Sequence, residues 1–257
     1  MYSLKVITAV LLAGAASTPM LAQALPPAVV GWPGPVHYNP ADSNTIGKSS
    51  AISNINSTRQ ASGRPTVHES AIQARKILSL EKYGVLATIF QDDAKPPSPP
   101  GTPIALPEYF ADCEHNGNPT FAAISVDPPF INAAAGSNVS LCVEWHPDPS
   151  SPLAASPAAL PRFSLTGYIE ALSAEEIAQQ DVAKCFLAAH PDSKPWVPGP
   201  GSVHMSQWAR LVVTDVYWFG GFGNVALIQW LPIEEWRNVT QEEMDAMALP
   251  GLDASED

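Results

Sequence analysis

The sequence predicts one mainly β domain, an antiparallel barrel with flanking helices, over about residues 66–240. Three observations support this prediction. Six or seven segments have the short apolar or alternating pattern of strands, and two have the spacing of helices. The two kinds of segment do not alternate regularly, as they would in a doubly wound parallel sheet. No internal repeat is visible that would indicate a solenoid or a propeller.

Composition limits the classes of function. The 257 residues, 46% of them apolar, are enough for one large hydrophobic core or two small ones. Lysine and arginine together number 13 against 25 aspartates and glutamates, which gives a formal net charge of −12. A nucleic-acid partner needs cations against its phosphates, so this balance argues against DNA or RNA. The 3 cysteines are too few for a small scaffold held together by disulfides.

Residues 1–24 have the layout of a secretory signal peptide. Lys5 is followed by an apolar run, Val6–Ala16, and Ala22-Gln23-Ala24 forms a cleavage-site pattern. The apolar run is shorter than the roughly 20 residues that a transmembrane helix needs, so no membrane anchor is expected. Residues 25–65, rich in proline, serine and asparagine, are expected to form a flexible leader. The protein is therefore predicted to be secreted, to the extracellular space or to a vacuolar or endolysosomal compartment.

The first ordered element is predicted to be a helix that begins after Thr66. Thr66 and Glu69 form a capping box, and apolar residues then recur at helical spacing until Gly84 ends the helix. A short run of strand-forming residues follows at 85–90.

Further strands are separated by turns and proline-rich loops. A hairpin is expected at Asn116-Gly117, which supplies the positive φ of a tight turn. A second capping box, Ser173 with Glu176, begins a helix that runs to about residue 189. The other expected segments are a loop at 92–103, strands at 109–113 and 120–126, a helical turn at 130–135, strands at 139–145 and 163–172, and strands at 208–217 and 224–230. Residues 241–257, which contain several acids and no base, are predicted to be a solvated acidic tail.

Three sequons and three cysteines agree with export. Asn56, Asn138 and Asn238 each begin an Asn-x-Ser/Thr triplet, so they are the predicted glycosylation sites. In an oxidising compartment two of the three cysteines are expected to pair, and the sequence does not decide which two. Cys113 and Cys142 are the disulfide candidates, and Cys185 is interpreted as a small buried residue on the core-facing side of its helix.

The common catalytic motifs are missing from the sequence. It contains no G-x-S-x-G, H-E-x-x-H, P-loop or C-x-x-C pattern. Its 6 histidines are scattered, and none has a second metal ligand at suitable spacing. No catalytic residue and no metal site are therefore assigned. The glycine-rich segment Gly220–Gly223 is interpreted as a turn or bulge between two strands.

Two groups of residues resemble known families. Ala74–Leu78 with Tyr83–Ile89 resembles the opening of flavin-binding split barrels of the pyridoxamine-phosphate-oxidase type. The later stretch resembles the CREG glycoproteins more specifically, and the resemblance covers about residues 66–240. Its matching pieces are Phe163–Gly167, His190-Pro191, Trp196, Trp208–Phe219 followed by Gly220-Gly221, and Glu234–Thr240.

This resemblance implies a six-stranded antiparallel split β-barrel that forms a homodimer. CREG proteins are secreted or endolysosomal glycoproteins thought not to use flavin, whereas cytoplasmic relatives with this barrel bind FMN and some bind haem. The first hypothesis is therefore a non-catalytic CREG-like glycoprotein without a cofactor. Its barrel would recognise a protein or a glycan receptor, with strand aromatics such as Trp208 and Trp218 at the dimer seam.

The alternative is an FMN-dependent or haem-linked oxidoreductase. An FMN phosphate brings nearly two negative charges, which this class of barrel meets with basic side chains and hydroxyls. If a flavin binds, Arg75, Arg162 and Arg210 are the candidates for its phosphate, and Gly220 and Gly221 lie near its ring. Arg210 lies among strand residues, so its structural interpretation is an ion pair with a partner such as Asp215 or Glu170. Lys95 is the only base between Val85 and Pro161, so this acidic chain is expected to bind FMN poorly.

Overall fold

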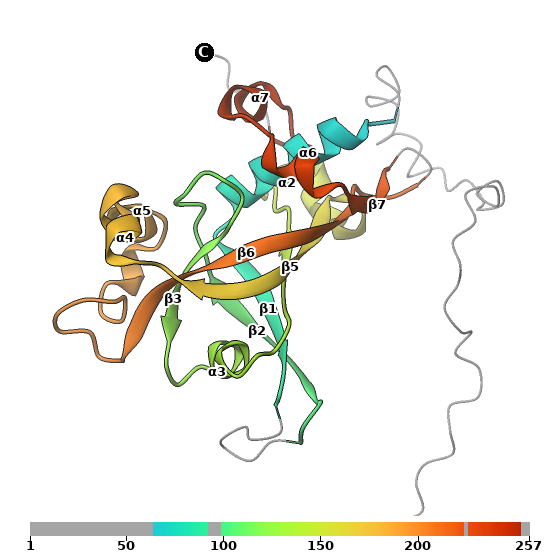
Figure 1. Cartoon of the computed structure of the whole chain (residues 1–257). Helices are drawn as coiled ribbons and strands as arrows, with labels where there is room; N and C mark the ends of the chain where they lie inside the picture. The colour runs from blue at the N-terminus through green and yellow to red at the C-terminus, as the bar shows by residue number, and fades with distance from the viewer. Residues whose placement is uncertain (1–63, 92–98, 224–225, 253–257) are drawn as a thin grey trace, which may run out of the picture. The chain divides into compact units, whose positions relative to one another are not determined.

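The computed structural model describes residues 64–91, 99–223 and 226–252, which all lie in one compact unit (Figure 1). The predicted signal peptide, the leader as far as residue 63 and Asn56 lie outside the described residues. The helices are α2 (Val67–Leu80), α3 (Pro128–Ala134), α4 (Ala174–Gln179), α5 (Val182–Ala189), α6 (Ile233–Arg237) and α7 (Gln241–Ala246). The strands are β1 (Tyr83–Ile89), β2 (Pro103–Tyr109), β3 (Thr120–Ile124), β4 (Val139–Glu144), β5 (Arg162–Ala171), β6 (Ser206–Phe219) and β7 (Ile228–Leu231).

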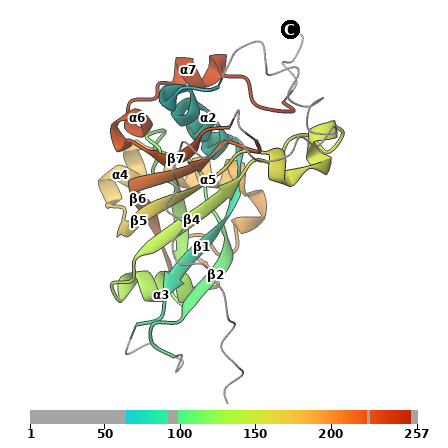
Figure 2. The same ribbon diagram turned by 90° about the vertical axis from the view of Figure 1, so that its right-hand side faces the viewer.

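The strands form one curled antiparallel sheet. Six of them follow the order β2-β1-β4-β5-β6-β3, and the short β7 pairs with β6. Figures 1 and 2 show α2, α6 and α7 gathered at one end of this sheet and α3 at the opposite end. The mainly β class and the six-stranded split barrel predicted from the sequence are therefore confirmed.

Helix α2 begins where its capping box predicts. The Thr66 hydroxyl accepts from the Glu69 amide, and the Glu69 carboxylate accepts from the Thr66 amide. The helix ends at Leu80, earlier than expected, and Gly84 belongs to β1. A Cβ at Gly84 would lie 2.8 Å from the carbonyl oxygen of Cys142 on β4. Glycine is therefore placed here by the close approach of two strands, not by a helix end.

The predicted hairpin around Asn116-Gly117 is wrong. Strand β2 starts at Pro103, inside the region expected to be a loop, and pairs with β1. Strand β3 pairs with β6 at the other edge of the sheet, and a single bridge between Ala111 and Thr120 joins the two edges. Prolines are tolerated on an edge strand, where the missing amide faces away from the ladder. Because of its two prolines, β2 was not recognised as a strand from the sequence.

Two buried clusters form the core. The larger lies inside the sheet and under α2, and contains Phe163, Trp218 and Trp236. The smaller packs α5 against β6 and includes Phe186 and Trp208. Trp208 is 5% exposed and Trp218 1% exposed, so the expectation that they form a dimer seam is wrong. Both side chains fill the core of a single chain.

Two further boundaries differ from expectation. The single helix expected to about residue 189 is two helices, α4 and α5, separated at Asp181, whose φ of 47° is left-handed. The predicted solvated tail is partly folded, because a third capping box, Thr240 with Glu243, begins α7. Met244 of α7 is buried in the main core.

Candidate functional site

The outer face of the sheet carries a groove of about 610 Å³. It crosses β1, β4, β5 and β6 near the β1 end that carries Ile89. Its lining includes Ala87, Pro103, Asn138, Ser140, Thr166, Tyr168, Thr214 and Asp215. Among the described residues that line it, Asp215 is the charged one and none is basic. The groove therefore offers hydroxyls, one carboxylate and one aromatic ring.

A β-bulge shapes the polar side of this groove. The pairing of β5 with β6 shifts between Thr166 and Gly167, which leaves Thr214 as the extra residue. A Cβ at Gly167 would lie 1.9 Å from the Val212 carbonyl oxygen, so the close approach of the strands requires glycine. The Thr214 hydroxyl lies 2.9 Å from Asp215 Oδ2, and the Thr166 hydroxyl 3.5 Å from the same oxygen. The bulge thus fixes the Asp215 carboxylate among hydroxyls.

The first of the three candidate arginines, Arg75, lies inside the protein. It is 1% exposed, and it donates from Nη1 to the Trp236 carbonyl at 3.0 Å and from Nη2 to the His115 carbonyl at 2.9 Å. Burial lowers the pKa of this guanidinium, while the charge of Asp112 raises it. Arg75 therefore holds the chain after β2 and helix α6 against α2, and does not line the groove.

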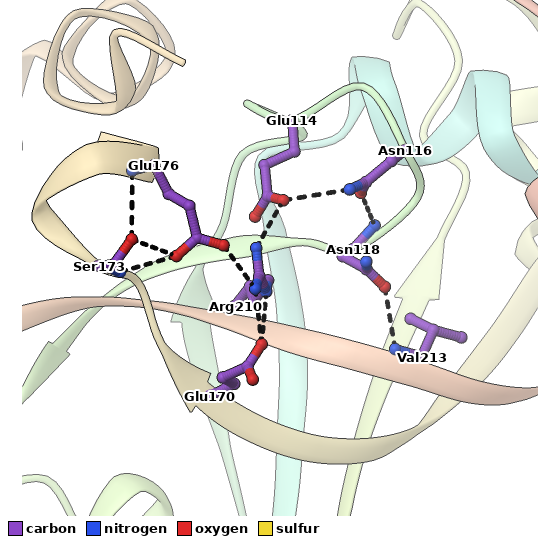
Figure 3. Close-up of polar contacts among 8 residues, drawn as sticks. All are labelled: Glu114, Asn116, Asn118, Glu170, Ser173, Glu176, Arg210 and Val213. Carbon is purple, nitrogen blue, oxygen red and sulfur yellow. Dashed lines mark hydrogen bonds and ion pairs between the residues drawn. The ribbon is translucent and has the colours of Figure 1, made fainter. Parts of the chain in front are cut away.

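Arg210 is surrounded by carboxylates (Figure 3). It donates to Glu170 from Nε at 2.8 Å and from Nη2 at 2.7 Å. Nη1 donates to Glu114 at 2.9 Å, and Nη2 also reaches Glu176 at 2.8 Å. The Ser173 hydroxyl and amide, followed by Arg210, lower the pKa of Glu176 to about 2. The cluster ties α4 and the chain before β3 to β5 and β6.

Figure 3 also shows how this cluster continues along β6. The Asn116 amide donates to Glu114 at 3.1 Å, and the Asn118 backbone amide donates to the Asn116 side-chain oxygen at 2.9 Å. The Asn118 side-chain oxygen accepts from the Val213 amide at 3.0 Å. The Asn116-Gly117 turn thus anchors the network rather than a hairpin.

The other predicted cofactor residues also lie away from the groove lining. Arg162 stands on the outer face with Cζ 3.9 Å from the centre of the Phe219 ring, a cation–π contact. Gly220 donates its amide to the Leu227 carbonyl, and Gly221 has a φ of 118°. Both glycines belong to the turn between β6 and β7. The structure does not bring the three arginines together.

The cysteine pairing corrects the prediction. Cys113 is bonded to Cys185, with the two Cα atoms 5.7 Å apart, and Cys142 is a free thiol. Cys142 points to the outer face of β4, whereas Cys113 lies in the smaller core cluster against α5. Cys185 does face the smaller cluster, but the interpretation of it as a small buried residue is wrong, because it is half-buried and bonded to Cys113.

Two of the predicted glycosylation sites lie within the described residues. Asn138 is exposed just before β4, at the rim of the groove. Asn238 is exposed in the turn between α6 and α7. Neither position is shielded by the fold.

Two titratable clusters escaped the sequence analysis. Burial first, and then a hydrogen bond to Asp127, raise the pKa of Glu108 to about 9. Since Glu108 is on β2 and Asp127 follows β3, this acid pair bridges the edges of the open barrel. On α2, His68 lies 2.7 Å from Glu235 of α6 and 2.8 Å from Glu243 of α7. Such pairs are remote in sequence, so only the fold reveals them.

Within residues 64–91, 99–223 and 226–252, no three histidine, cysteine, aspartate or glutamate side chains are arranged so that they could hold a metal ion. In the same part of the chain, no helix has both the length and the apolar composition needed to cross a bilayer.

Comparison with known proteins gives a family match. The family model described as "CREG, beta-barrel" matches residues 65–238. No curated protein matches the sequence significantly.

Several solved structures are similar to this chain. A heme binding protein from Mycobacterium smegmatis is 22% identical with a TM-score of 0.51, over 68% of this chain and 61% of that one. The protein Atu2129 from Agrobacterium tumefaciens, described as of unknown function, is 18% identical with a TM-score of 0.47, over 68% and 62%. A putative pyridoxamine 5'-phosphate oxidase from Listeria innocua is 19% identical with a TM-score of 0.36, over 58% and 96%. The chain thus covers less than two thirds of the first two structures.

Proposed function

The chain belongs to the CREG β-barrel family, and from this membership we propose that it is a secreted, dimeric glycoprotein that acts as a recognition module rather than a catalyst. Its partner would be a protein or a glycan receptor, met outside the cell or in a vacuolar or endolysosomal compartment. No cofactor is part of this proposal.

The observation that carries the proposal is the state of the candidate arginines. An FMN phosphate needs basic groups that are free to face it. The Arg75 guanidinium is buried between two carbonyls, and that of Arg210 is bound by three glutamates. The groove itself contributes Asp215, which would repel a phosphate. The described residues therefore do not fit a tightly held FMN.

Export is supported by the bonded cysteines and the accessible sequons. A disulfide such as Cys113–Cys185 persists in oxidising compartments. Asn138 and Asn238 are both exposed, as a glycosylated asparagine must be. Export itself rests on the signal-like pattern at the N-terminus.

Dimerisation is supported by an exposed row of side chains on the outer face, which we call the aromatic strip. It is formed by Tyr217 and Trp230 on neighbouring strands and by the aliphatic Val85 at its far end. The register of the sheet places these residues in one row across β1, β4, β5, β6 and β7. Val85, Tyr217 and Trp230 are 41%, 37% and 57% exposed. A stable interface buries about 800 Å² on each partner and favours aromatic residues. A second copy of the chain is the occupant we propose.

A second candidate function is a haem-linked or FMN-dependent oxidoreductase. It is favoured by the fold shared with a heme binding protein and by Arg162, which faces the outer side of the sheet. One arginine stacked on Phe219 is a smaller cationic set than a phosphate or two propionates call for. We therefore rank this function second.

The visible absorption spectrum of protein purified from a secretory host separates the two candidates. A colourless protein supports the recognition module. A yellow or Soret-absorbing chromophore that stays bound through gel filtration would support the oxidoreductase. Sedimentation of the same sample tests the dimer, and a monomer at micromolar concentration would contradict it.

A further inference from the structure

Asn138 and Tyr168 are cross-strand neighbours. One position beyond the pairing of Val139 with Gly167, Asn138 comes opposite Tyr168 on β5. Side chains opposite each other in an antiparallel pair point to the same face, with Cβ atoms about 5 Å apart. Both residues line the groove. A group attached to Asn138 therefore starts next to the Tyr168 ring.

The Tyr168 ring is free to receive such a group. It is 52% exposed, and it stands beside the polar side of the groove where Thr214 and Asp215 lie. A tyrosine ring has an apolar face and a polar tip, so it suits ligands that mix C–H surface with hydroxyls. The Asp215 carboxylate accepts hydrogen bonds from hydroxyl or amide donors. This set favours a neutral, polyhydroxylated ligand.

We propose that the groove binds the N-linked glycan on Asn138, with its first N-acetylglucosamine stacked on Tyr168. The inference rests on the proposed glycoprotein. A tethered ligand meets its site at an effective concentration of about a millimolar, so contacts too weak to capture a free sugar suffice here. The glycan would cover this end of the outer face and leave the aromatic strip open for the second copy.

The protein also offers an internal control. Asn238 is an exposed sequon in the turn between α6 and α7 and does not line the groove. A glycan there does not start beside this groove. The rate at which an amidase releases each glycan from native protein therefore compares a glycan bound in the groove with a glycan away from it, within the same molecule.

The test is timed enzymatic deglycosylation of native protein from a glycosylating host, followed by mass spectrometry of each site. We expect release at Asn138 to be about three- to tenfold slower than at Asn238, the range that one aromatic contact supplies. Tyr168→Ala should remove this difference, and Tyr168→Phe should keep it. Tyr83→Ala, which changes an exposed tyrosine outside both the groove and the aromatic strip, should also keep it.

Each other outcome has a distinct meaning. Equal release at both sites, or slow release at Asn138 that persists in Tyr168→Ala, would contradict the binding of the Asn138 glycan in the groove. Protection that grows with protein concentration would assign it to the second copy instead. Glycans at Asn238 but none at Asn138 would overturn the inference and leave the glycoprotein proposal standing, whereas no glycan at any site would contradict both.

Discussion

Arg210 donates two hydrogen bonds to a single oxygen of Glu170, at 2.8 Å from Nε and 2.7 Å from Nη2. The two residues are direct partners across the β5–β6 ladder. Because Glu114 and Glu176 take the remaining contacts, the Arg210 guanidinium is neutralised within the fold. This arrangement joins four segments of the barrel and supports the proposed recognition function.

Arg210→Ala should destabilise the fold. It leaves Glu114, which is 5% exposed, without its cationic partner. We expect a loss of about 2 kcal/mol in the free energy of unfolding, since an uncompensated buried charge is costly. Urea denaturation measures it, with Arg162→Ala as a control that should change stability by less than about 0.5 kcal/mol. Equal stability of the Arg210 and Arg162 variants would show that the cluster is not structural.

The disulfide makes a different prediction. Replacing Cys185 by serine opens a loop between residues separated by 72 positions and should cost about 2–4 kcal/mol. Cys142→Ser should be nearly neutral, because its thiol is unpaired and half-exposed. Thiol titration of the native protein should find one free cysteine, and peptide mapping should join Cys113 to Cys185. A bond from Cys113 to Cys142 would contradict the structure.

His68 should make stability depend on pH. Hydrogen bonds to Glu243 and then Glu235 raise the pKa of His68 above 6.5, because both ring nitrogens must be protonated to donate. The extra stability is fully present below pH 6.5 and is lost as the pH rises through the folded-state pKa. Melting temperatures measured from pH 5 to 8 should therefore fall in the native chain. His68→Gln should flatten this part of the profile, and an unchanged slope would exclude His68 as its source.

The acid pair at the barrel opening extends this trend to higher pH. With a folded-state pKa of about 9 against 4.5 for an ordinary glutamate, Glu108 stabilises the protein most below pH 4.5. This contribution is lost progressively as the pH rises through about 9. Glu108→Gln should weaken the decline of the urea midpoint between pH 5 and 9, and Glu144→Gln, at the exposed end of β4, is the matched control. If the decline is equally steep in Glu108→Gln, protonation of Glu108 is not its cause.

Local patterns predicted part of this fold, and long-range contacts decided the rest. The capping boxes at Thr66 and Ser173 fix helix starts because their hydrogen bonds lie within one turn. Strand β4 could be predicted because its alternation matches a half-buried sheet. In contrast, β2 was missed because it is rich in proline. Helix α7 was missed because the acidic residues at its start were interpreted as part of a solvated tail.

The candidate site was harder to predict than the fold. The groove depends on a bulge between β5 and β6, and no short sequence motif predicts that bulge. The sequence analysis offered Asp215 or Glu170 as the structural partner of Arg210, and the structure pairs Arg210 with Glu170. It could not foresee Glu114 and Glu176, which reach Arg210 from separate segments. Asn138 was found as a sequon, but its neighbour Tyr168 follows from strand register alone.

A flavin fluorescence titration tests the central claim most directly. Purified protein is added to FMN at fixed ionic strength, and the flavin emission is followed to protein concentrations of about 100 μM, at which a site with a Kd of about 10 μM is about 90% occupied. The arrangement of Arg75 and Arg210 predicts no saturable change in emission. Saturation at one FMN per chain, with a Kd below about 10 μM and weakened by Arg162→Ala, would contradict it.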